Sequence, residues 1–598
     1  MRSIRLWAPC VVLAFALALP ASAGAAPTEP LGHAGRWITD AAGKVVVLHG
    51  FNTVPYNEPI LPVDMGMGPD NAEWLAANGF NTIRLGLYYA RVEPEPGVYD
   101  DAYLDDYLRV QEELAAEGIF TLLDIHQDQL HPRYGTTGGP LPSRGFPAWF
   151  LKEDGLPNTA TPYPQGYLTN PALNRAYDNI WIDFDAGDGV SVQNHFAAGW
   201  RRLAAAFKDR PGLLGYDIFN EPWPGSAAAS CSSPTGCPGG GFDQTLLTAF
   251  TRKLTAALRA EDPDHLIFYE PNLLFDYGAP TRVGDPGDPN AGFAFHNYCL
   301  TIVVPGLPSG EPCAVGEELV LDNAEAHSET TGDALLLSEF GPDLATARRQ
   351  TRLADEHMMS WQFWDYYGDF EGSLHIAASP ALIRPYPQLV AGTPERWSYD
   401  DASKTFDFVY SPERATGEGA VSSAPARFPA GSETEIFIPA LHYPSGYGVS
   451  LAGAEVASGP GDRLLRLRAC PGANTVQVQV TPAPRPSVSC AIPGSRACQF
   501  KVFGTRRADR LLGGPFGDRL VGRGGRDRLS GRRGDDCLSG GRGADRLYGG
   551  GGVDRLRGGP GGDMIRARDG KRDVVRCGRG HDRVRFDSLD KVIGCGTG

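Results

Sequence analysis

Short apolar runs recur between residues 30 and 382 and predict strands that are buried on both faces. They lack the strict alternation of apolar and polar positions that a half-buried strand shows. The eight runs are KVVVLHG (44–50), NTIRLGL (81–87), FTLLDIH (120–126), LLGYDIF (213–219), LIFYEP (266–271), FAFHNY (293–298), ALLLSEF (334–340) and SWQFWDY (360–366).

Amphipathic segments with helical spacing separate these runs, for example at residues 102–118, 194–209 and 244–262. Strands that alternate with helices over some 350 residues predict an α/β fold, a (β/α)8 TIM barrel, over residues 30–382. The carboxyl ends of the strands in such a barrel share one mouth, where the chemistry takes place. Polar residues gather at the ends of the runs: His49, Asn52, Arg84, His126, Asp128, Asn220, Glu221, Glu270, His296, Tyr298, Glu339 and Asp365.

The pattern changes after residue 382, where short β-type runs separated by turn residues replace the helical segments. They lie at 405–411, 433–440, 446–453, 463–470 and 474–482 and predict a small β-sandwich over residues 383–485. A proline-rich stretch, TPAPRPS (481–487), then reads as a stiff linker.

Residues 500–598 form an internal repeat of nine residues. Aspartates recur at 509, 518, 527, 536, 545, 554 and 563, and an aliphatic residue stands two places after each one. This register resembles the RTX-type calcium-binding nonapeptides and implies a parallel β-roll-like tail. The resemblance implies Ca²⁺ bound by the aspartates, with these metal ligands expected: Asp518, Asp527, Asp536, Asp545, Asp554 and Asp563. Arg523 and Arg532 replace an expected glycine, and arginine follows most aspartates, so Arg–Asp pairing could replace some calcium sites.

The first 23 residues have the features of a secretory signal peptide: Arg2 and Arg5, an apolar run from Val11 to Leu19, and an Ala-Ser-Ala cleavage site. Ten cysteines remain outside it. We expect short disulfide loops at Cys231–Cys237 and Cys299–Cys313, whereas the pairing of the other cysteines stays open. Together these features predict a protein secreted from a bacterium.

Charge is unevenly distributed along the chain. Residues 501–598 carry 23 Lys and Arg against 13 Asp and Glu, a net +10, which leaves −26 on residues 1–500. An acidic body argues against nucleic acid as a partner.

Two glutamates stand out at the predicted mouth, Glu221 in NEP (220–222) and Glu339 in SEFG (338–341). A glycosidic bond is cleaved by two carboxyl groups, one as the acid and base and the other as the nucleophile or the activator of water. Their positions at strands four and seven match a glycoside hydrolase clan in which the first glutamate is the acid and base and the second the nucleophile. No catalytic cofactor is expected.

Several motifs together resemble glycoside hydrolase family 5, and within it the endoglycoceramidase-related group: VVVLHGFNTV (45–54), LLDIHQDQL (122–130), DIFNEPW (217–223), FHNYC (295–299), LLLSEFG (335–341) and IRPYPQLVAGTP (383–394). The resemblance covers about residues 35–485. It implies a retaining β-glycosidase that acts on a glycosphingolipid or a related β-glycoside, with peripheral contact to lipid surfaces.

The resemblance also implies roles for the residues around the two glutamates. Arg84 would hold Glu339 ionised, Tyr298 would donate to Glu339, and Asn220 would bind the sugar 2-hydroxyl. His126, Asp128 and His296 would line the substrate site, and Trp364 would stack under a sugar ring. The long segment from Gln127 to Asp183 could form an apolar slot for a lipid, with residues 146–151 and 56–68 as candidate walls.

Two other functions stay open. One is a family 5 β-glucanase acting on polysaccharide, and the other is a non-catalytic carbohydrate-binding surface protein with a calcium-stabilised tail. Single residues such as Arg84, His296 and Trp364 could also be a structural ion pair, a core histidine and a core tryptophan. The sequence leaves the sugar, the aglycone and the oligomeric state open.

Overall fold

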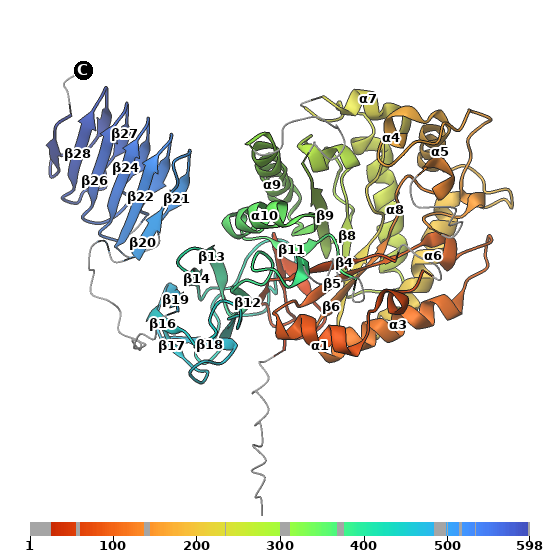
Figure 1. The fold of residues 1–598 in the computed structure, drawn as a ribbon, viewed down its shortest axis with the longest axis horizontal. Coiled ribbons are helices and arrows are strands. Elements are labelled where there is room, and N and C mark those ends of the chain that lie inside the picture. Colours follow the sequence, from red (N-terminus) through yellow and green to blue (C-terminus); the bar gives the residue numbers. More distant parts are fainter. Residues whose placement is uncertain are drawn as a thin grey trace, which may run out of the picture.

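The computed structural model describes residues 26–55, 60–136, 144–233, 235–299, 311–367, 376–482, 498, 500–513, 517–532 and 534–595. The chain runs from a barrel through a sandwich into a ladder of parallel strands (Figure 1). The predicted signal peptide, most of the linker and Cys490 lie outside the described residues.

Eight parallel strands form a closed barrel, which confirms the predicted fold. Its strands, in chain order, are β4 (His49–Thr53), β5 (Thr82–Leu87), β6 (Phe120–Ile125), β7 (Leu213–Asp217), β8 (Leu266–Tyr269), β9 (Ala291–Asn297), β10 (Ala334–Phe340) and β11 (Ser360–Phe363). Each strand comes from one of the eight apolar runs, because strands covered by helices outside and side chains inside need apolar residues on both faces.

The first apolar run is divided between two sheets, so the placement of His49 at the barrel mouth was wrong. Val45 and Val46 form β3 (Val45–Val46) in the sandwich, and the barrel strand β4 only begins at His49. His49 therefore lies at the end of the barrel opposite the mouth. Its ring stacks between Trp361 and Tyr386, at 4.3 and 3.7 Å between ring centroids.

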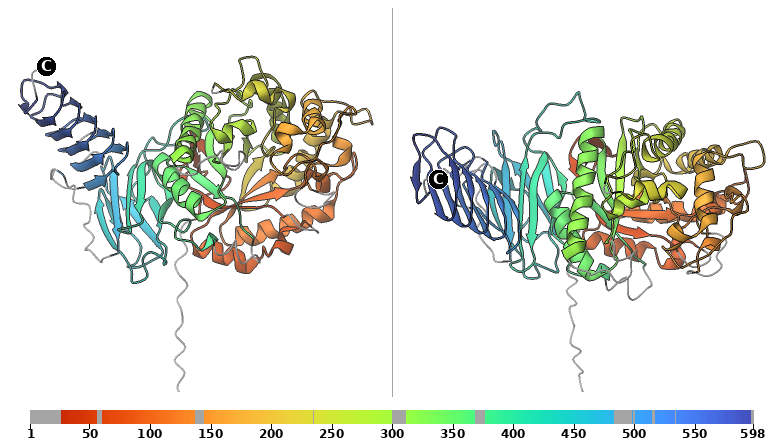
Figure 2. Two further views of the ribbon diagram at one scale, coloured as in Figure 1. Left: turned by 45° about the horizontal axis from the view of Figure 1, so that its top comes forward. Right: turned by 90° about the horizontal axis from the view of Figure 1, so that it is seen from above.

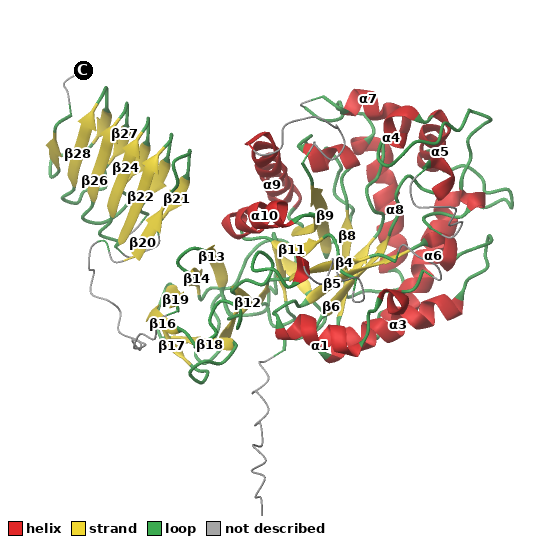
Figure 3. Ribbon diagram, in the orientation of Figure 1, coloured by secondary structure: helices red, strands yellow, loops and turns green. Residues whose placement is uncertain are grey.

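Helices surround the barrel (Figure 3). The longest are α3 (Asp101–Ala116), α6 (Val192–Phe207), α8 (Thr248–Arg259), α9 (Glu311–Thr331) and α10 (Leu344–His357), and shorter ones include α1 (Pro69–Ala77) and α5 (Pro171–Trp181). One continuous apolar core lies between helices and strands, and a second set of side chains, including Leu122, Leu214 and Phe268, fills the barrel. In the described part of the chain, no helix is both long enough and apolar enough to cross a bilayer.

Two antiparallel sheets form the predicted sandwich. The first has the strand order β1-β2-β3-β12-β15-β18-β17, from β1 (Gly32–Ala34), β2 (Trp37–Thr39), β3, β12 (Tyr386–Val390), β15 (Glu433–Phe437), β18 (Leu464–Ala469) and β17 (Ala454–Val456). The second has the order β13-β14-β19-β16, from β13 (Thr393–Asp400), β14 (Thr405–Ser411), β19 (Val476–Thr481) and β16 (Gly448–Ala452). Strands β1, β2 and β3 precede the barrel in the chain, whereas the other four strands of the same sheet follow the barrel. This shared sheet joins the sandwich to the barrel.

The tail is a roll of two parallel sheets that extends away from the sandwich (Figure 2). One sheet contains β20 (Phe500–Phe503), β22 (Asp518–Gly524), β24 (Cys537–Arg542), β26 (Arg555–Pro560), β28 (Val574–Arg579) and β30 (Lys591–Ile593). The other contains β21 (Arg510–Leu512), β23 (Arg528–Ser530), β25 (Arg546–Tyr548), β27 (Met564–Arg566) and β29 (Arg583–Arg585). The repeat aliphatics stack between the sheets as a narrow core, as the nine-residue register predicts.

Candidate active site

Two buried glutamates face one another at the carboxyl ends of the barrel strands. Glu221 follows β7, the fourth barrel strand, and Glu339 lies near the end of β10, the seventh. They are 3% and 5% exposed. One carboxylate oxygen from each, together with a ring nitrogen of His296, lie within 4.8 Å of one another. The barrel therefore brings the two glutamates together at one mouth, as their positions at strands four and seven predicted.

Local backbone features direct these side chains into the mouth. A register shift between Leu337 and Glu339 in the pairing of β10 with β9 sets Glu339 opposite His296. Such bulges re-aim side chains at functional sites. Glu221 has a φ of 47°, in the left-handed region that non-glycine residues seldom adopt.

Side chains from two neighbouring strand ends hold this unusual turn. The backbone N–H of Glu221 donates to Glu270 at 2.8 Å. The Gln127 amide donates to the backbone carbonyls of Asn220 and Glu221, at 2.9 and 3.2 Å. Gln127 is itself held by Leu130 N–H and the Tyr177 hydroxyl, both at 2.8 Å. Glu221 is thus anchored through its backbone while its carboxyl group faces Glu339.

Two residues donate hydrogen bonds to Glu339, and His296 lies at ion-pair distance from it. The Tyr298 hydroxyl donates at 2.7 Å and Arg84 at 3.2 Å, while Nε2 of His296 lies 3.4 Å away. Burial nevertheless raises the pKa of Glu339 to about 7, since the favourable effects of His296 and Arg84 do not fully offset desolvation and the nearby Glu221. Both contacts to Glu339 expected from the sequence are present, and Arg84 acts on the pKa of Glu339 in the expected direction, towards the ionised form.

Glu221 has fewer donors. Nδ1 of His296 lies 3.0 Å from Oε1, and Oε2 has no hydrogen-bond partner among the described residues. Burial raises the pKa of Glu221, opposed by His296 and reinforced by Asp128 and Glu270. Fewer donors and a free oxygen favour the proton on Glu221 rather than on Glu339.

His296 lies between the two glutamates. Its Nε2 is 3.3 Å from Glu270. Although burial favours the neutral ring, the Glu270 and Glu339 carboxylates raise the pKa of His296 well above its usual value. Nδ1 of the ring lies at hydrogen-bond distance from Glu221, whereas Nε2 lies at ion-pair distance from Glu270 and Glu339 and has no hydrogen-bond partner among the described residues.

Arg84 is fully buried beneath the two glutamates and connects four carboxylates. Its nitrogens lie 3.0 Å from Asp124, 2.9 Å from Asp217, 3.0 Å from Glu270 and 3.2 Å from Glu339. It also donates to the side-chain oxygens of Asn52 and Asn220, at 3.1 and 2.9 Å.

The sequence did not single out several residues of this network. Glu270 was noted at a strand end without a role, and three others had none: Asp124, Asp217 and Gln127. The available signal was a carboxylate inside a buried strand, as in LLDIH and GYDIF, because such a group needs a buried cation.

A second cluster lies beside the first. Asp124 accepts from Nδ1 of His126 at 2.8 Å, and Asp128 lies 3.7 Å from Nε2. Although burial opposes it, the two aspartates raise the pKa of His126 to about 10. The Trp364 ring stacks on His126 with 5.3 Å between centroids. The structure thus brings His126, Asp128 and Trp364 together, whereas the Asn220 amide is engaged by Arg84 and the Gln127 carbonyl.

A cavity of about 380 Å³ opens onto Glu339. Its walls are rich in aromatic side chains and include Tyr88, Tyr163, Tyr277, Tyr298 and Trp364. The long segment after β6 supplies much of the lining, from Asp128 to Tyr163, as the sequence suggested. The two candidate walls were wrong in the described residues: Phe146 and Phe150 pack in the barrel core, and Ile60 packs with Val54 and Tyr88.

The repeat aspartates point into the roll. Each of those from Asp518 to Asp563 is buried, and Oδ1 of Asp545, for example, accepts the backbone N–H of Asp527 at 2.8 Å. The second carboxylate oxygens of several have no hydrogen-bond partner among the described residues: Asp527, Asp536, Asp545, Asp554 and Asp563. Calcium prefers such carboxylate oxygens with backbone carbonyls, so this donor set fits the ion.

Glycine and arginine positions in the tail also have physical reasons. A Cβ on Gly540 would lie 2.4 Å from Oδ2 of Asp545, so only glycine fits there. Arg523 and Arg532 have φ values of 73° and 71°, so they adopt the left-handed conformation of the glycines they replace. Among the described residues, no arginine forms an ion pair with Asp527, Asp536, Asp545, Asp554 or Asp563, so Arg–Asp pairing does not replace calcium ligands at these five positions.

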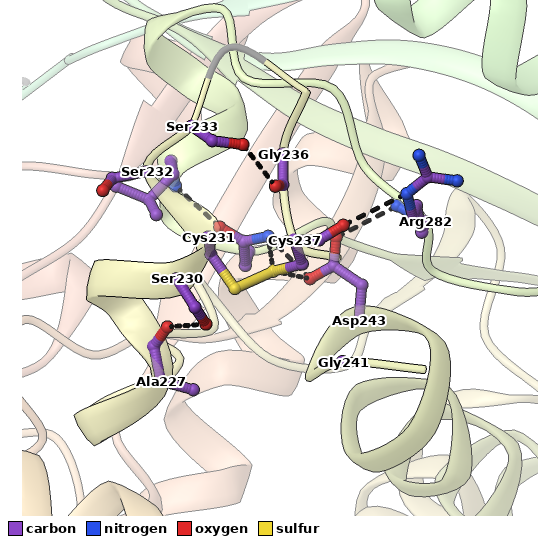
Figure 4. The surroundings of a disulfide bond; sticks show 12 residues. Ala227, Ser230, Cys231, Ser232, Ser233, Gly236, Cys237, Gly241, Asp243 and Arg282 are labelled. Atoms are coloured by element: carbon purple, nitrogen blue, oxygen red, sulfur yellow. Dashed lines mark hydrogen bonds between the residues drawn. A yellow bond between two sulfur atoms is a disulfide. The ribbon is translucent and has the colours of Figure 1, made fainter. Parts of the chain in front are cut away.

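Both expected disulfides are present. Cys231–Cys237 closes a loop after β7, and Asp243 and Arg282 lie against it (Figure 4). Cys299–Cys313 follows Tyr298 directly. The pairing that the sequence left open includes Cys498–Cys537 and Cys577–Cys595, both in the tail, and Cys470 is also disulfide-bonded.

Family models match all three parts of the chain. The model described as cellulase (glycosyl hydrolase family 5) matches residues 39–369, and the family 5 C-terminal domain matches residues 384–481. The RTX calcium-binding nonapeptide repeat matches residues 503–538 and 538–565.

Similar proteins include curated relatives and solved structures. Endoglycoceramidase I from Rhodococcus hoagii (strain 103S) is 32% identical over 472 residues, covering 76% of this chain and 89% of the relative. An endoglycoceramidase from Hydra vulgaris is 27% identical, and the match covers 69% of this chain and 80% of the relative. A ganglioside GM3 complex of endo-glycoceramidase II from Rhodococcus sp. has a TM-score of 0.60 at 27% identity, covering 75% of this chain and 99% of that one.

Proposed function

The chain belongs to glycoside hydrolase family 5, and we propose that it is a secreted retaining β-glycosidase that hydrolyses glycosphingolipid-type or related β-glycosides. Glu339 is the nucleophile and Glu221 the acid and base. The observation that carries the proposal is the separation of the two carboxylates, within 4.8 Å. Retaining glycosidases hold them about 5 Å apart, whereas inverting enzymes leave room for a water molecule between them.

In the first step, a Glu339 oxygen attacks the anomeric carbon while Glu221 gives its proton to the glycosidic oxygen. The C–O bond to the aglycone breaks, and a glycosyl-enzyme ester forms on Glu339. In the second step, Glu221 removes a proton from water. The water oxygen attacks the same carbon, and Glu339 leaves as a carboxylate, so the product keeps its configuration.

The surrounding residues support this division of roles. Glu339 has donors from Arg84 and Tyr298, which stabilise a carboxylate. Glu221 has one donor and a free oxygen that can carry the proton to the leaving group. His296 lies between the two carboxyl groups, with Nδ1 at hydrogen-bond distance from Glu221 and Nε2 at ion-pair distance from Glu339.

A glycolipid is the substrate class that the cavity and the relatives favour. The two endoglycoceramidase relatives and the structure titled as a ganglioside complex are named for such substrates. His126, Asp128, Asn220 and Trp364 would contact the sugar, and the aromatic walls beside Glu339 would accept the start of the aglycone.

The flanking units complete the proposal. Residues 1–23 direct secretion, residues 30–382 carry catalysis, residues 383–485 buttress the barrel, and residues 500–598 bind Ca²⁺. Disulfides in each of the three units suit an oxidising compartment.

Turnover of a substrate panel by matched variants tests the proposal. Glu339→Gln should abolish turnover, since an amide cannot form the ester. Glu221→Ala should lose most activity on poor leaving groups and recover activity on activated aryl β-glycosides with azide, giving a β-glycosyl azide. Near-normal rates for Glu339→Gln would reject the assignment. Hydrolysis of β-glucan in preference to glycolipid would favour the polysaccharide alternative, and inactivity on the whole panel would favour a binding protein.

A further inference from the structure

One outer face of the roll presents arginine at most of its exposed positions. The five strands of the sheet β21-β23-β25-β27-β29 read RLL, RLS, RLY, MIR and RVR, with the middle residue facing inward. Arginine therefore stands at six of the ten outward positions, which we call the arginine face: Arg510, Arg528, Arg546, Arg566, Arg583 and Arg585.

Strand register stacks three of these arginines in one column. Arg510 pairs with Arg528, and Arg528 with Arg546, on successive parallel strands. Neighbouring strands lie about 4.8 Å apart, and like charges directly opposite one another repel. Among the described residues these three arginines have no ion-pair partner. The fold thus fixes an uncompensated row of positive charge.

The opposite sheet also presents arginines, but in shorter runs. One outward column alternates Arg519, Cys537, Arg555 and Val574, and in the other column only Arg557 and Arg576 are stacked. On the arginine face, Tyr548 lies between Arg528 and Arg566, at 5.5 and 5.3 Å from its ring. The two faces of the roll therefore differ in charge pattern although they come from one repeat.

Burial of the repeat aspartates leaves the positive charge of the tail dominant at its surface. The repeat aspartates are buried inside, so most of the negative charge of the tail is hidden while the arginines remain exposed. The tail is net +10 and the rest of the chain net −26. The acidic body would be repelled by an anionic surface, whereas this face would be attracted.

We propose that the arginine face binds the anionic headgroups of a lipid bilayer and thereby brings the enzyme to its substrate; this rests on the proposed function, in which the substrate is an amphiphile. Guanidinium groups stacked on successive strands of one sheet can donate together to neighbouring phosphate and carboxylate groups of a lipid surface. A lipid surface is favoured over a soluble polyanion because the proposed substrate is itself a bilayer component.

Vesicle co-sedimentation of the full chain, at one fixed calcium concentration, tests the proposal. Vesicles of phosphatidylcholine alone are compared with vesicles that also contain phosphatidylserine. The variant R528Q/R546Q/R566Q removes three neighbouring arginines of the face. The matched control, R519Q/R557Q/R576Q, removes three outward arginines from the opposite sheet.

The wild type should bind only the anionic vesicles, and more weakly as salt rises. The face variant should lose about a hundredfold in binding, and the control much less. Both variants should keep wild-type turnover of a soluble aryl β-glycoside. If the wild type itself does not hydrolyse that substrate, the proposed function fails, whatever the result of vesicle binding. Absence of anionic-vesicle binding, equal loss in both variants, or binding to dextran sulfate without binding to vesicles would overturn the proposal.

Discussion

Arg84 is the residue on which the buried charge of the site depends. It is the common partner of Asp124, Asp217 and Glu270 as well as Glu339. Although burial opposes ionisation, His296 and Arg84 lower the pKa of Glu270 to about 2. Burying several carboxylates is tolerable only while this cation remains.

Arg84→Met should therefore destabilise the barrel by about 3–5 kcal/mol at neutral pH, because it leaves buried charges without a partner. A depressed carboxyl pKa contributes stability above the unfolded value of about 4.3, and this is lost as pH falls towards the folded value. The difference in the free energy of unfolding between wild type and Arg84→Met should thus become smaller in acid. Denaturant unfolding at several pH values measures this difference. The control is Arg202→Met, which breaks an exposed pair with Asp101 and should change stability by less than about 1 kcal/mol. A gap independent of pH would contradict the role of Arg84.

Tyr298 tunes the ionisation of Glu339. Its hydroxyl donates at 2.7 Å, and a donor to a carboxylate favours the charged form. Tyr298→Phe should raise the pKa of Glu339 above about 7, so the rising limb of the bell-shaped kcat/KM profile should move to higher pH. Tyr277→Phe, on the same cavity wall, should leave that limb in place. An unmoved limb in Tyr298→Phe would show that Glu339 does not set it.

At the scale of elements, the loops after β6 and β7 act as one unit. The Gln127 side chain from the first loop holds the backbone carbonyls of Asn220 and Glu221 in the second. The left-handed φ of Glu221 is unfavourable for a non-glycine residue, so these contacts fix the direction of its carboxyl group.

Gln127→Leu should loosen the turn at Glu221 and lower kcat by about 10- to 100-fold, with little change in KM. The loss should be large for glycosides with poor leaving groups and small for activated aryl glycosides, which need less help from an acid. Tyr177→Phe removes only one partner of Gln127 and should show the same pattern more weakly. An equal loss on both substrate classes would indicate a general structural defect instead.

The sequence predicted those elements that depend on local patterns and missed features that depend on contacts between residues far apart in the chain. Each barrel strand was visible as an apolar run, because its burial on both faces is a local property. The split of KVVVLHG between two sheets was not, since Val45 and Val46 pair with β12, a strand that follows the barrel. Glu221 and Glu339 were found from strand order, whereas the convergence of Asp124, Asp217 and Glu270 on Arg84 requires the closed barrel.

At the scale of the whole molecule, the barrel, the sandwich and the roll have apolar cores of different size. The barrel and the sandwich have broad cores. The core of the roll is narrow: one aliphatic residue per repeat, from Leu511 to Val575, lies between the two sheets, and two disulfides join parts of the tail. The regular nine-residue register made the roll predictable, because every repeat makes the same contacts. Its thin core makes the tail the unit that most needs another source of stability.

Calcium should supply that stability. An ion that binds only the folded roll stabilises it by mass action, and the buried aspartate oxygens without partners offer the ligands. Expressed from Cys498 onward with its disulfides intact, the tail should be largely disordered in EDTA and gain β-structure in millimolar Ca²⁺, followed by circular dichroism. Asp545→Asn keeps an acceptor for the Asp527 N–H but removes the charge, so this variant should need more calcium to fold. Asp569→Asn, at an exposed turn, should fold at the wild-type calcium concentration.

In the full chain, EDTA should leave turnover of a soluble aryl β-glycoside unchanged, because Glu221 and Glu339 lie within the barrel. Identical, folded spectra with and without calcium would show that the thin core and the disulfides suffice.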